Sequence, residues 1–492
     1  MSSAKEPVTR RFGNGLTVLI KEDKSHPVVS LQYWVGTGSM NEGHWQGSGL
    51  SHLLEHLVFK GTEHYSGQDL ARKVQERGGH WNAYTSVNRT VYYIDGPADS
   101  WQIFLNLLTE LVFFPTFPED ELEREKGVVR REMAMYADDP DSVAYQLLMQ
   151  TLYLKHPRRW PVLGEPAAFD CLTRQDVLDY HASRYVPNNV VLSIAGDVDA
   201  AEIFSHLELL VEDLKSRPLN RELIPHEPHQ FGSRRVRKEF AVPYSKLNLA
   251  WRLPCSGHPD TPALSALASI LGGGRSARFY EKFHDRLGLV YSIEVHSNQS
   301  ETDEGAFTIS IDVDRAQRDK VRDLVLQELR NLAQEDFTED LKRVCKQTRV
   351  SRLRRRSSAA GVASEMGADW FGARNLNLSS EWQEAIERVT TEDLHRVCST
   401  WLSSPNVTEV SLDPVGSNAA EEDGSAAGTE TALSEHVLGN GMKVVIREDH
   451  RLPLAYACLA FKAGCRAENE HDAGVTLSLI HISEPTRRRG IS

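Results

Sequence analysis

Cysteine is scarce in this chain of 492 residues, and long apolar runs are missing from it. The absence of a Cys-x-x-Cys pair argues against a disulfide framework or a zinc knuckle and favours reduced thiols. No apolar run approaches the length of a membrane span, and Met1–Pro7 contains no apolar signal region. We therefore expect no membrane span and a cytoplasmic location, with a periplasmic or secreted form as the alternative. The six scattered cysteines are Cys171, Cys255, Cys345, Cys398, Cys458 and Cys465.

Basic residues are outnumbered, with 56 Lys and Arg against 69 Asp and Glu, and the net charge is −13. This balance argues against nucleic acid as a partner. The basic run Arg352-Leu353-Arg354-Arg355-Arg356 is more typical of a solvated helix face than of a binding patch. The length predicts two to four domains, and a hydrophobic content of 40% is enough to build their cores.

The motif His52-Leu53-Leu54-Glu55-His56 combines two histidines and a carboxylate within one short segment. Histidines four positions apart on a helix lie on the same side, about one turn from each other. This spacing suits two imidazoles that bind one zinc ion, and Glu55 can reach a metal-bound water. The order His-x-x-Glu-His is the motif of the inverzincins.

The flanking sequence predicts that this motif lies on one amphipathic helix that ends near Gly61. His52, Glu55 and His56 fall on the side opposite an apolar stripe. The alternative, an amphipathic helix with two solvated histidines, stays open at this point. The stripe is formed by Leu50, Leu53, Leu54, Leu57 and Val58.

A second predicted helix, around residues 119–136, supplies carboxylates for a third ligand. We expect Glu125 and Glu132 on its apolar face, where a buried carboxylate needs a cation. Zinc is one such cation for Glu132, and pairing with Arg72 or Arg89 is the alternative. The expected apolar face also holds Val128, Val129 and Tyr136, and the expected outward face holds Glu123, Lys126, Arg130 and Arg131.

With these residues the chain resembles the pitrilysin/insulinase family of zinc metallopeptidases, which includes processing peptidases. The resemblance covers most of the chain, including Phe59-Lys60-Gly61-Thr62. It implies an α+β fold of repeated processing-peptidase-like units, each an antiparallel-rich sheet packed with helices. It also implies one Zn²⁺ per chain, with Glu55 as general base and Glu125 as a supporting carboxylate. The zinc ligands that it implies are His52, His56 and Glu132.

The segment from Gly78 to Ile94 predicts a β-hairpin rich in β-branched and aromatic residues. By resemblance, its first strand is an edge strand beside the zinc, to which a peptide or unfolded protein adds as another strand. An ordinary hairpin is the alternative. The substrate-binding residues on this reading are Asn82, Ala83, Tyr84 and Thr85.

The chain also repeats itself. The segment from Thr173 to Ile194 is echoed from Thr390 to Val407, as expected of two related α+β units at residues 1–217 and 218–415. The second unit lacks the His-x-x-Glu-His motif, so we expect it to be non-catalytic. Its glycine-rich segment 271–278 lacks the ending of a phosphate loop. Because His284 stands where the family often has arginine, we assign no catalytic role to Tyr291.

A third copy begins near the end of the chain. After a flexible linker at residues 416–432, the segment Leu438–Asp449 repeats Phe12–Asp23. We expect residues 433–476 to be a truncated third homologous unit. Residues 477–492 resemble a translated sequencing adapter, so we expect no role for His481. A missing C-terminal half or a homologous subunit would then complete a substrate chamber.

These features predict a zinc-dependent metalloendopeptidase that hydrolyses peptides or unfolded polypeptides, with zinc-activated water and Glu55 as general base. Two alternatives stay open. The chain could be a non-catalytic homologous substrate-binding subunit, although such subunits lose motif residues that are all present here. It could also be a peptidase subunit that is active only with a partner half. Cleavage specificity and oligomeric state are not predicted.

Overall fold

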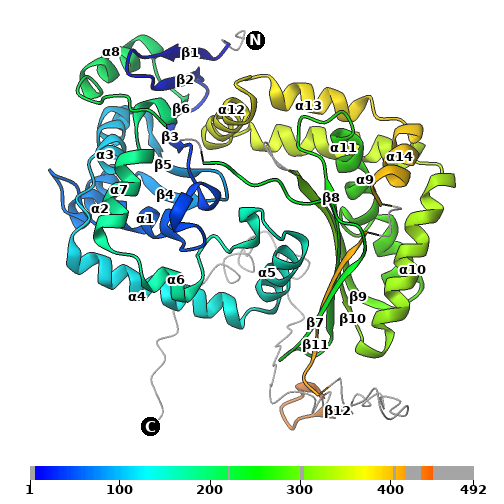
Figure 1. Ribbon diagram of the computed structural model, residues 1–492. Helices are drawn as coiled ribbons and strands as arrows, with labels where there is room; N and C mark the ends of the chain where they lie inside the picture. The colour runs from blue at the N-terminus through cyan, green and yellow to red at the C-terminus, as the bar shows by residue number, and fades with distance from the viewer. Residues whose placement is uncertain (1–5, 220–221, 300–303, 403–405, 417–433, 447–492) are drawn as a thin grey trace. The chain divides into compact units, whose positions relative to one another are not determined.

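The computed structural model describes residues 6–219, 222–299, 304–402, 406–416 and 434–446. They fall into two separate bodies, one within Met1–Gly424 and one within Ser425–Ser492. Within the first body, residues 1–217 and 218–415 each build one sheet, and we call them the first and second repeats. The expected α+β fold is confirmed, since both sheets are packed with helices (Figure 1).

The first repeat contains a six-stranded sheet in the order β1-β2-β6-β3-β5-β4, with β4 at one edge. β2 pairs with β6 in parallel, and the other neighbours pair antiparallel. The strands are β1 (Val8–Arg11), β2 (Thr17–Glu22), β3 (Val28–Val35), β4 (His80–Thr85), β5 (Thr90–Pro97) and β6 (Val190–Gly196).

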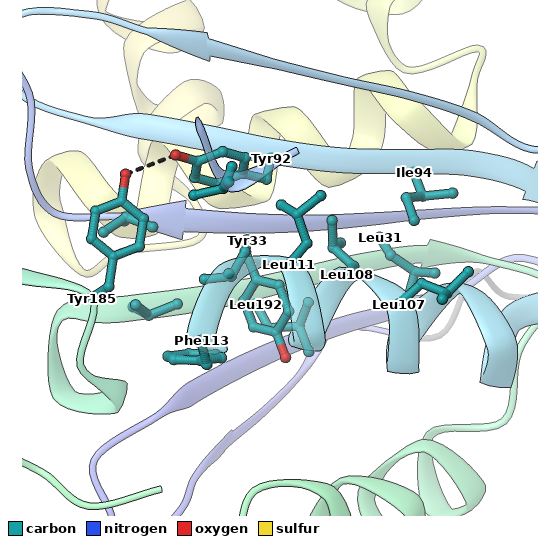
Figure 2. Packing of buried hydrophobic residues seen from close by; sticks show 14 of the residues in the cluster. Leu31, Tyr33, Tyr92, Ile94, Leu107, Leu108, Leu111, Phe113, Tyr185 and Leu192 are labelled. Carbon is teal, nitrogen blue, oxygen red and sulfur yellow. Dashed lines mark hydrogen bonds between the residues drawn. The ribbon is translucent and has the colours of Figure 1, made fainter. Parts of the chain in front are cut away.

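One face of this sheet forms the core of the first repeat, because alternate strand residues point to the same side. Leu31 and Ile94 of neighbouring strands meet leucines of α3, and the hydroxyls of Tyr92 and Tyr185 share a hydrogen bond of 2.8 Å (Figure 2). The helices packed on this core include α1 (Leu50–Val58), α2 (Gly67–Glu76), α3 (Trp101–Phe113), α4 (Glu119–Asp138), α7 (Arg174–Arg184) and α8 (Ala200–Leu210).

The second repeat builds its sheet with the same strand order and directions. Its order is β7-β11-β8-β10-β9, with β7 and β11 parallel and the other neighbours antiparallel. These strands correspond in turn to β2, β6, β3, β5 and β4. The strands are β7 (Arg234–Phe240), β8 (Ser245–Leu253), β9 (Val290–Asn298), β10 (Gly305–Val313) and β11 (Thr408–Pro414), and the helices include α9 (Thr261–Gly272), α10 (Arg318–Asn331), α11 (Thr338–Arg355), α13 (Leu378–Glu387) and α14 (Thr391–Val397).

The echo noted between the two segments appears as matching local structure. Thr173 and Thr390 each begin a helix, α7 and α14, with a reciprocal capping box to the residue three positions on. The strand that follows, β6 or β11, is the second strand of its sheet's parallel pair. Pro405 lies outside the described residues.

One helix of each repeat packs against the sheet of the other repeat. α12 (Ala359–Ala373), from the second repeat, packs on the outer face of β3 and β6, where Ser193 donates a hydrogen bond of 2.7 Å to the Ala363 carbonyl. α5 (Pro140–Leu152), from the first repeat, packs on the equivalent strands β8 and β11. Gly367 permits the first contact, because a Cβ there would lie 2.3 Å from the Trp34 ring. The two repeats therefore share their outer layers (Figure 1).

The second body contains a hairpin of β12 (Ser434–Val437) and β13 (Lys443–Ile446). It reproduces the β1–β2 hairpin in register, since Ser434 opposes Ile446 as Val8 opposes Ile20. The turn glycine has a positive φ in both, 91° at Gly15 and 84° at Gly441. The remainder of the expected third unit, and the expected tail at 477–492, lie outside the described residues.

Two sequence expectations about α4 were wrong. Lys126 was expected to face outward, but it is buried, because its Nζ donates to the carbonyls of Asp170 and Leu172 at 3.0 and 2.9 Å. Tyr136 was expected on the packed face and is exposed. In the second repeat, Arg352 and Arg356 of the basic run pair with the buried Glu365. Among the described residues, none of the helices has the length and apolar character to cross a membrane.

Candidate metal centre

The N-terminus of α1 is fixed by close backbone contacts. Gly49, the residue before the helix, has a φ of 72°, and a Cβ there would lie 2.0 Å from the Leu163 carbonyl oxygen. Only glycine fits this approach. Glu42 is almost completely buried, and its Oε1 accepts a hydrogen bond of 2.9 Å from the Ser51 backbone N–H. These contacts set the position of the helix that carries the motif.

The side chains of the motif residues project from α1 on the side opposite its apolar stripe, as the spacing predicted. The stripe is fully buried in the core of the first repeat. His52 is buried at 9% exposure, whereas Glu55 and His56 are half-buried. Burial, and then the neighbouring His56, lower the pKa of His52 to about 4. His52 is thus neutral at pH 7, which is the form that binds metals.

The structure brings Glu132 of α4 to the two histidines of α1. Its Oε2 lies 3.8 Å from the Nε2 of His52 and 3.8 Å from the Nε2 of His56. One ligand atom from each of the three residues lies within 4.8 Å of the others. In the part of the chain that the structure describes, this is the one group of three His, Cys, Asp or Glu residues so arranged. We call His52, His56 and Glu132 the metal-ligand group.

Glu125 precedes Glu132 by about two turns of α4. It contacts the Nδ1 side of the His56 ring, whereas Glu132 faces the Nε2 side. Its Oε2 accepts a hydrogen bond of 3.1 Å from the Nδ1 of His56, and its Oε1 pairs with the Nζ of Lys60 at 2.7 Å. The bond to Nδ1 leaves the Nε2 of His56 free to face Glu132. The alternative pairing with Arg72 is not what the structure has, because Arg72 pairs with Asp69 and Glu76.

Glu55 lies between the metal-ligand group and the sheet edge. The Thr85 hydroxyl, at the end of β4, donates a hydrogen bond of 2.5 Å to its Oε2. Burial raises the pKa of Glu55 above its ordinary value, and the Thr85 hydrogen bond opposes this shift. A carboxylate with a raised pKa is suited to accept a proton near neutral pH.

β4 is an edge strand of the described sheet, as expected for a strand that a peptide could extend. Asn82 and Tyr84 are exposed, and Ala83 and Thr85 are half-buried. The Ala83 backbone N–H donates to the Asn82 side-chain Oδ1 at 2.9 Å. This N–H is therefore not bonded to β5 and lies on the open side of the strand.

Three contacts of the centre were missed by sequence reasoning. Lys60 could have been found as the partner of Glu125, because it follows His56 by one helical turn. The Thr85–Glu55 hydrogen bond and the Glu42 cap join segments 30 and 9 residues apart, and no local pattern indicates them.

The donor set fits a zinc ion. Two imidazoles and one carboxylate, converging from two helices, are a common three-ligand set for catalytic zinc. The hydrogen bond from His56 to Glu125 is the support that a metal-ligating histidine usually has. The Nδ1 of His52 is buried without a hydrogen-bond partner in the described structure, so the other imidazole lacks this support.

Two family models and several known proteins match this chain. The family model described as "Insulinase (Peptidase family M16)" matches residues 17–165, and the one described as "Peptidase M16 inactive domain" matches residues 172–347. An uncharacterised zinc protease of Mycobacterium bovis is 30% identical over 299 residues, 59% of this chain and 67% of that protein. The chain belongs to peptidase family M16.

Other relatives match over more of the chain. An uncharacterised zinc protease of Rickettsia felis is 27% identical over 406 residues, 80% of this chain and 94% of that protein. The crystal structure of a protease from Helicobacter pylori has a TM-score of 0.76 and 25% identity, and it covers 83% of this chain and all of that one. The matches to these two proteins thus span both repeats.

Within this M16 chain, the metal-ligand group lies in the segment that the insulinase model matches. α9 follows β8 in the second repeat as α1 follows β3 in the first. Its sequence, Thr-Pro-Ala-Leu-Ser-Ala-Leu-Ala-Ser-Ile-Leu-Gly, contains no histidine or carboxylate. Tyr291, at the start of β9, is exposed and its ring lies 5.0 Å from that of Tyr244.

Proposed function

We propose that this protein is a zinc-dependent metalloendopeptidase acting on peptides or unfolded polypeptides. The observation that carries the proposal is the convergence of His52, His56 and Glu132 beside Glu55 and the open edge of β4. His52, His56 and Glu132 would hold one zinc ion per chain. When bound, zinc lowers the pKa of water and polarises a carbonyl group.

The remaining residues then have separate tasks. Glu55 accepts the proton of the attacking water and delivers it to the leaving amine, which its raised pKa favours. Thr85 orients the Glu55 carboxylate through its hydroxyl. Glu125 holds the ring of His56 and is neutralised by Lys60.

The substrate is expected to extend the first sheet at β4. Residues 82–85 would pair with the peptide through backbone hydrogen bonds, which tolerate many side-chain sequences. The same strand ends at Thr85, which touches Glu55. A peptide paired with β4 would therefore lie next to the general base.

The test is cleavage of a quenched fluorescent peptide by the full chain, with and without a chelator. Glu55→Gln should bind zinc as the unchanged chain does and lose at least about a thousandfold in kcat, because the proton acceptor is gone. Glu63→Gln, which alters an exposed glutamate close to the end of α1, is the matched control and should keep full activity. Undiminished cleavage by Glu55→Gln would refute the proposal.

A second candidate is a peptidase subunit that needs a partner half. The β12–β13 hairpin repeats the first hairpin of the first repeat in the same register, which suits a partner half built from the same kind of repeat and argues against a separate subunit. Zinc binding without cleavage by the full chain would support this candidate. Cleavage that appears only after a homologous half is added would establish it.

A further inference from the structure

A cavity of about 630 Å³ lies where the C-terminal end of α12 meets the strand ends of the first sheet. This volume is in the range of small-ligand sites. Its walls come from both repeats, because residues of β1, β6 and the β4–β5 turn face α12. The residues that matter here are Arg11, Asn88, Asn189, Trp370, Phe371 and Arg374.

The charged groups of this cavity have one sign. Arg11 and Arg374 both line it, and none of the described residues lining it is acidic. Glu208 pairs with the adjacent Arg10, and in the described part of the chain neither Arg11 nor Arg374 has a carboxylate partner. Although Arg374 is exposed as a residue, partial burial and then the Arg11 guanidinium lower its pKa. Two neighbouring cations repel each other unless an anion lies between them.

The ring of Trp370 forms part of the cavity wall beside Arg374. Its Nε1 is buried and does not face the open space, so the two guanidinium groups supply the charged donors. Trp370 lies one helical turn before Arg374, whose guanidinium is 6.0 Å from the indole ring.

The backbone at Arg374 is also unusual. Its φ is 55°, a left-handed conformation that arginine seldom adopts, and among the described non-glycine residues it shares a positive φ only with Phe117. Residues held in such conformations often belong to ligand-binding sites. A glycine or asparagine would end α12 here with less strain.

We propose that Arg11 and Arg374 form an anion-binding site at the junction of the two repeats. Because this group supplies donors and positive charge, its ligand carries carboxylate or phosphate oxygens. Arginine binds both groups through paired hydrogen bonds. A bound anion would join β1 of the first repeat to α12 of the second.

The ligand could come from two sources that share this chemistry. One is a free anion such as inorganic phosphate, and the other is a carboxylate of a peptide. Asn88, in the turn after β4, lines the cavity only three residues beyond Thr85. The cavity is therefore near the end of the proposed substrate strand, although the anion site does not depend on catalysis or on zinc.

The test measures binding to the full chain in the presence of an uncharged chelator such as phenanthroline, so that phosphate cannot act through a metal and the chelator brings no carboxylate of its own. The probes are inorganic phosphate and one peptide made with a free C-terminal carboxylate and with a C-terminal amide. At constant ionic strength, the melting temperature should rise with phosphate or free-carboxylate peptide and reach a plateau. The amidated peptide should have a smaller effect than the free-carboxylate form if the peptide carboxylate is the ligand.

Variants separate the site from general charge effects. Arg374→Asn keeps a residue that tolerates the left-handed backbone and removes the guanidinium, and we expect about tenfold weaker binding. Arg11→Gln should also weaken binding. Arg354→Gln, an exposed arginine of α11, is the charge-matched control and should bind normally. Binding of neither anion, or equal weakening in Arg354→Gln and Arg374→Asn, would overturn the proposal.

Discussion

At the residue scale, the centre depends on how Glu125 connects Lys60 to His56. A buried carboxylate alone would be costly, but here one oxygen pairs with the Lys60 ammonium and the other accepts from imidazole. The hydrogen bond between Glu125 and the Nδ1 of His56 leaves the Nε2 of His56 facing Glu132. The role of Glu125 follows from its contact with a ligand residue, not from contact with the reacting atoms.

Replacing Glu125 by Gln should weaken zinc binding by about 10- to 100-fold, the usual effect of changing the group behind a metal-ligating histidine. The amide oxygen of the introduced side chain can still accept a hydrogen bond from His56, but the substitution leaves Lys60 without its anion. Competition with a fluorescent zinc chelator measures the change. Glu123→Gln, on the exposed face of the same helix, is the control, and equal affinities for both variants would contradict the assignment.

Glu42 gives a pH dependence of stability. Burial raises its pKa from 4.5 to about 8, against the opposing hydrogen bonds from Ser51. Between these values the folded chain keeps a proton that the unfolded chain has released, so this group makes stability fall as pH rises. The loss is complete above the folded pKa.

Glu42→Gln removes this ionisation and keeps an acceptor oxygen for the Ser51 N–H. Relative to the unchanged chain, the variant should gain up to about 1.4 kcal/mol of unfolding free energy per pH unit between about pH 5 and 7.5. Urea unfolding of chelator-treated protein at several pH values measures this difference. Parallel curves for the two proteins would show that the Glu42 pKa is not raised.

At the element scale, β4 joins the sheet edge to Glu55. Its inner side pairs with β5 in register, and its last residue holds Glu55. Its outer side carries the Ala83 N–H, which now donates only to Asn82. The strand thus presents a free edge beside the Glu55 carboxylate.

Ala83→Pro removes this outward N–H and is compatible with an edge strand, where proline is tolerated if the lost donor faces outward. If substrates pair with β4, KM should rise about three- to tenfold, as expected for one lost hydrogen bond. Zinc affinity should be unchanged, because α1 and α4 are not altered. Steady-state kinetics beside a zinc titration measure both, and an unchanged KM would argue against pairing at Ala83.

The sequence predicted the elements of the centre better than their surroundings. The spacing of apolar residues and histidines predicted α1, and the hairpin composition predicted β4 and β5. The same reasoning failed for Lys126, because backbone carbonyls far along the chain accept its hydrogen bonds. It also did not predict that α5 packs on the sheet of the second repeat and α12 on the sheet of the first. An apolar helix face indicates burial but does not identify the sheet that buries it.

At the scale of the whole molecule, the metal-ligand group and both sheets lie within the first body. The second body contains a described hairpin whose second strand, β13, exposes Val445 and Ile446. In the first repeat the equivalent strand β2 is buried because β6 pairs with it.

A chain shortened to residues 1–416 should therefore keep one zinc per chain and an unchanged melting temperature. All residues that hold the centre, and the helices α5 and α12, come before this point. Metal analysis and thermal unfolding of the purified shortened chain, beside the full chain, measure both quantities. Loss of zinc on shortening would mean that residues after 416 contribute to the centre.

Because α5 and α12 each pack on the sheet of the other repeat, cleavage of the backbone between the repeats has a predictable result. The connection between α8 and β7 is the stretch of chain that leads from one repeat into the other. A protease that cut there would not release two fragments, because each would still hold the helix that covers the other's sheet. The repeats are interlocked by packing, so the connecting segment is dispensable for their association.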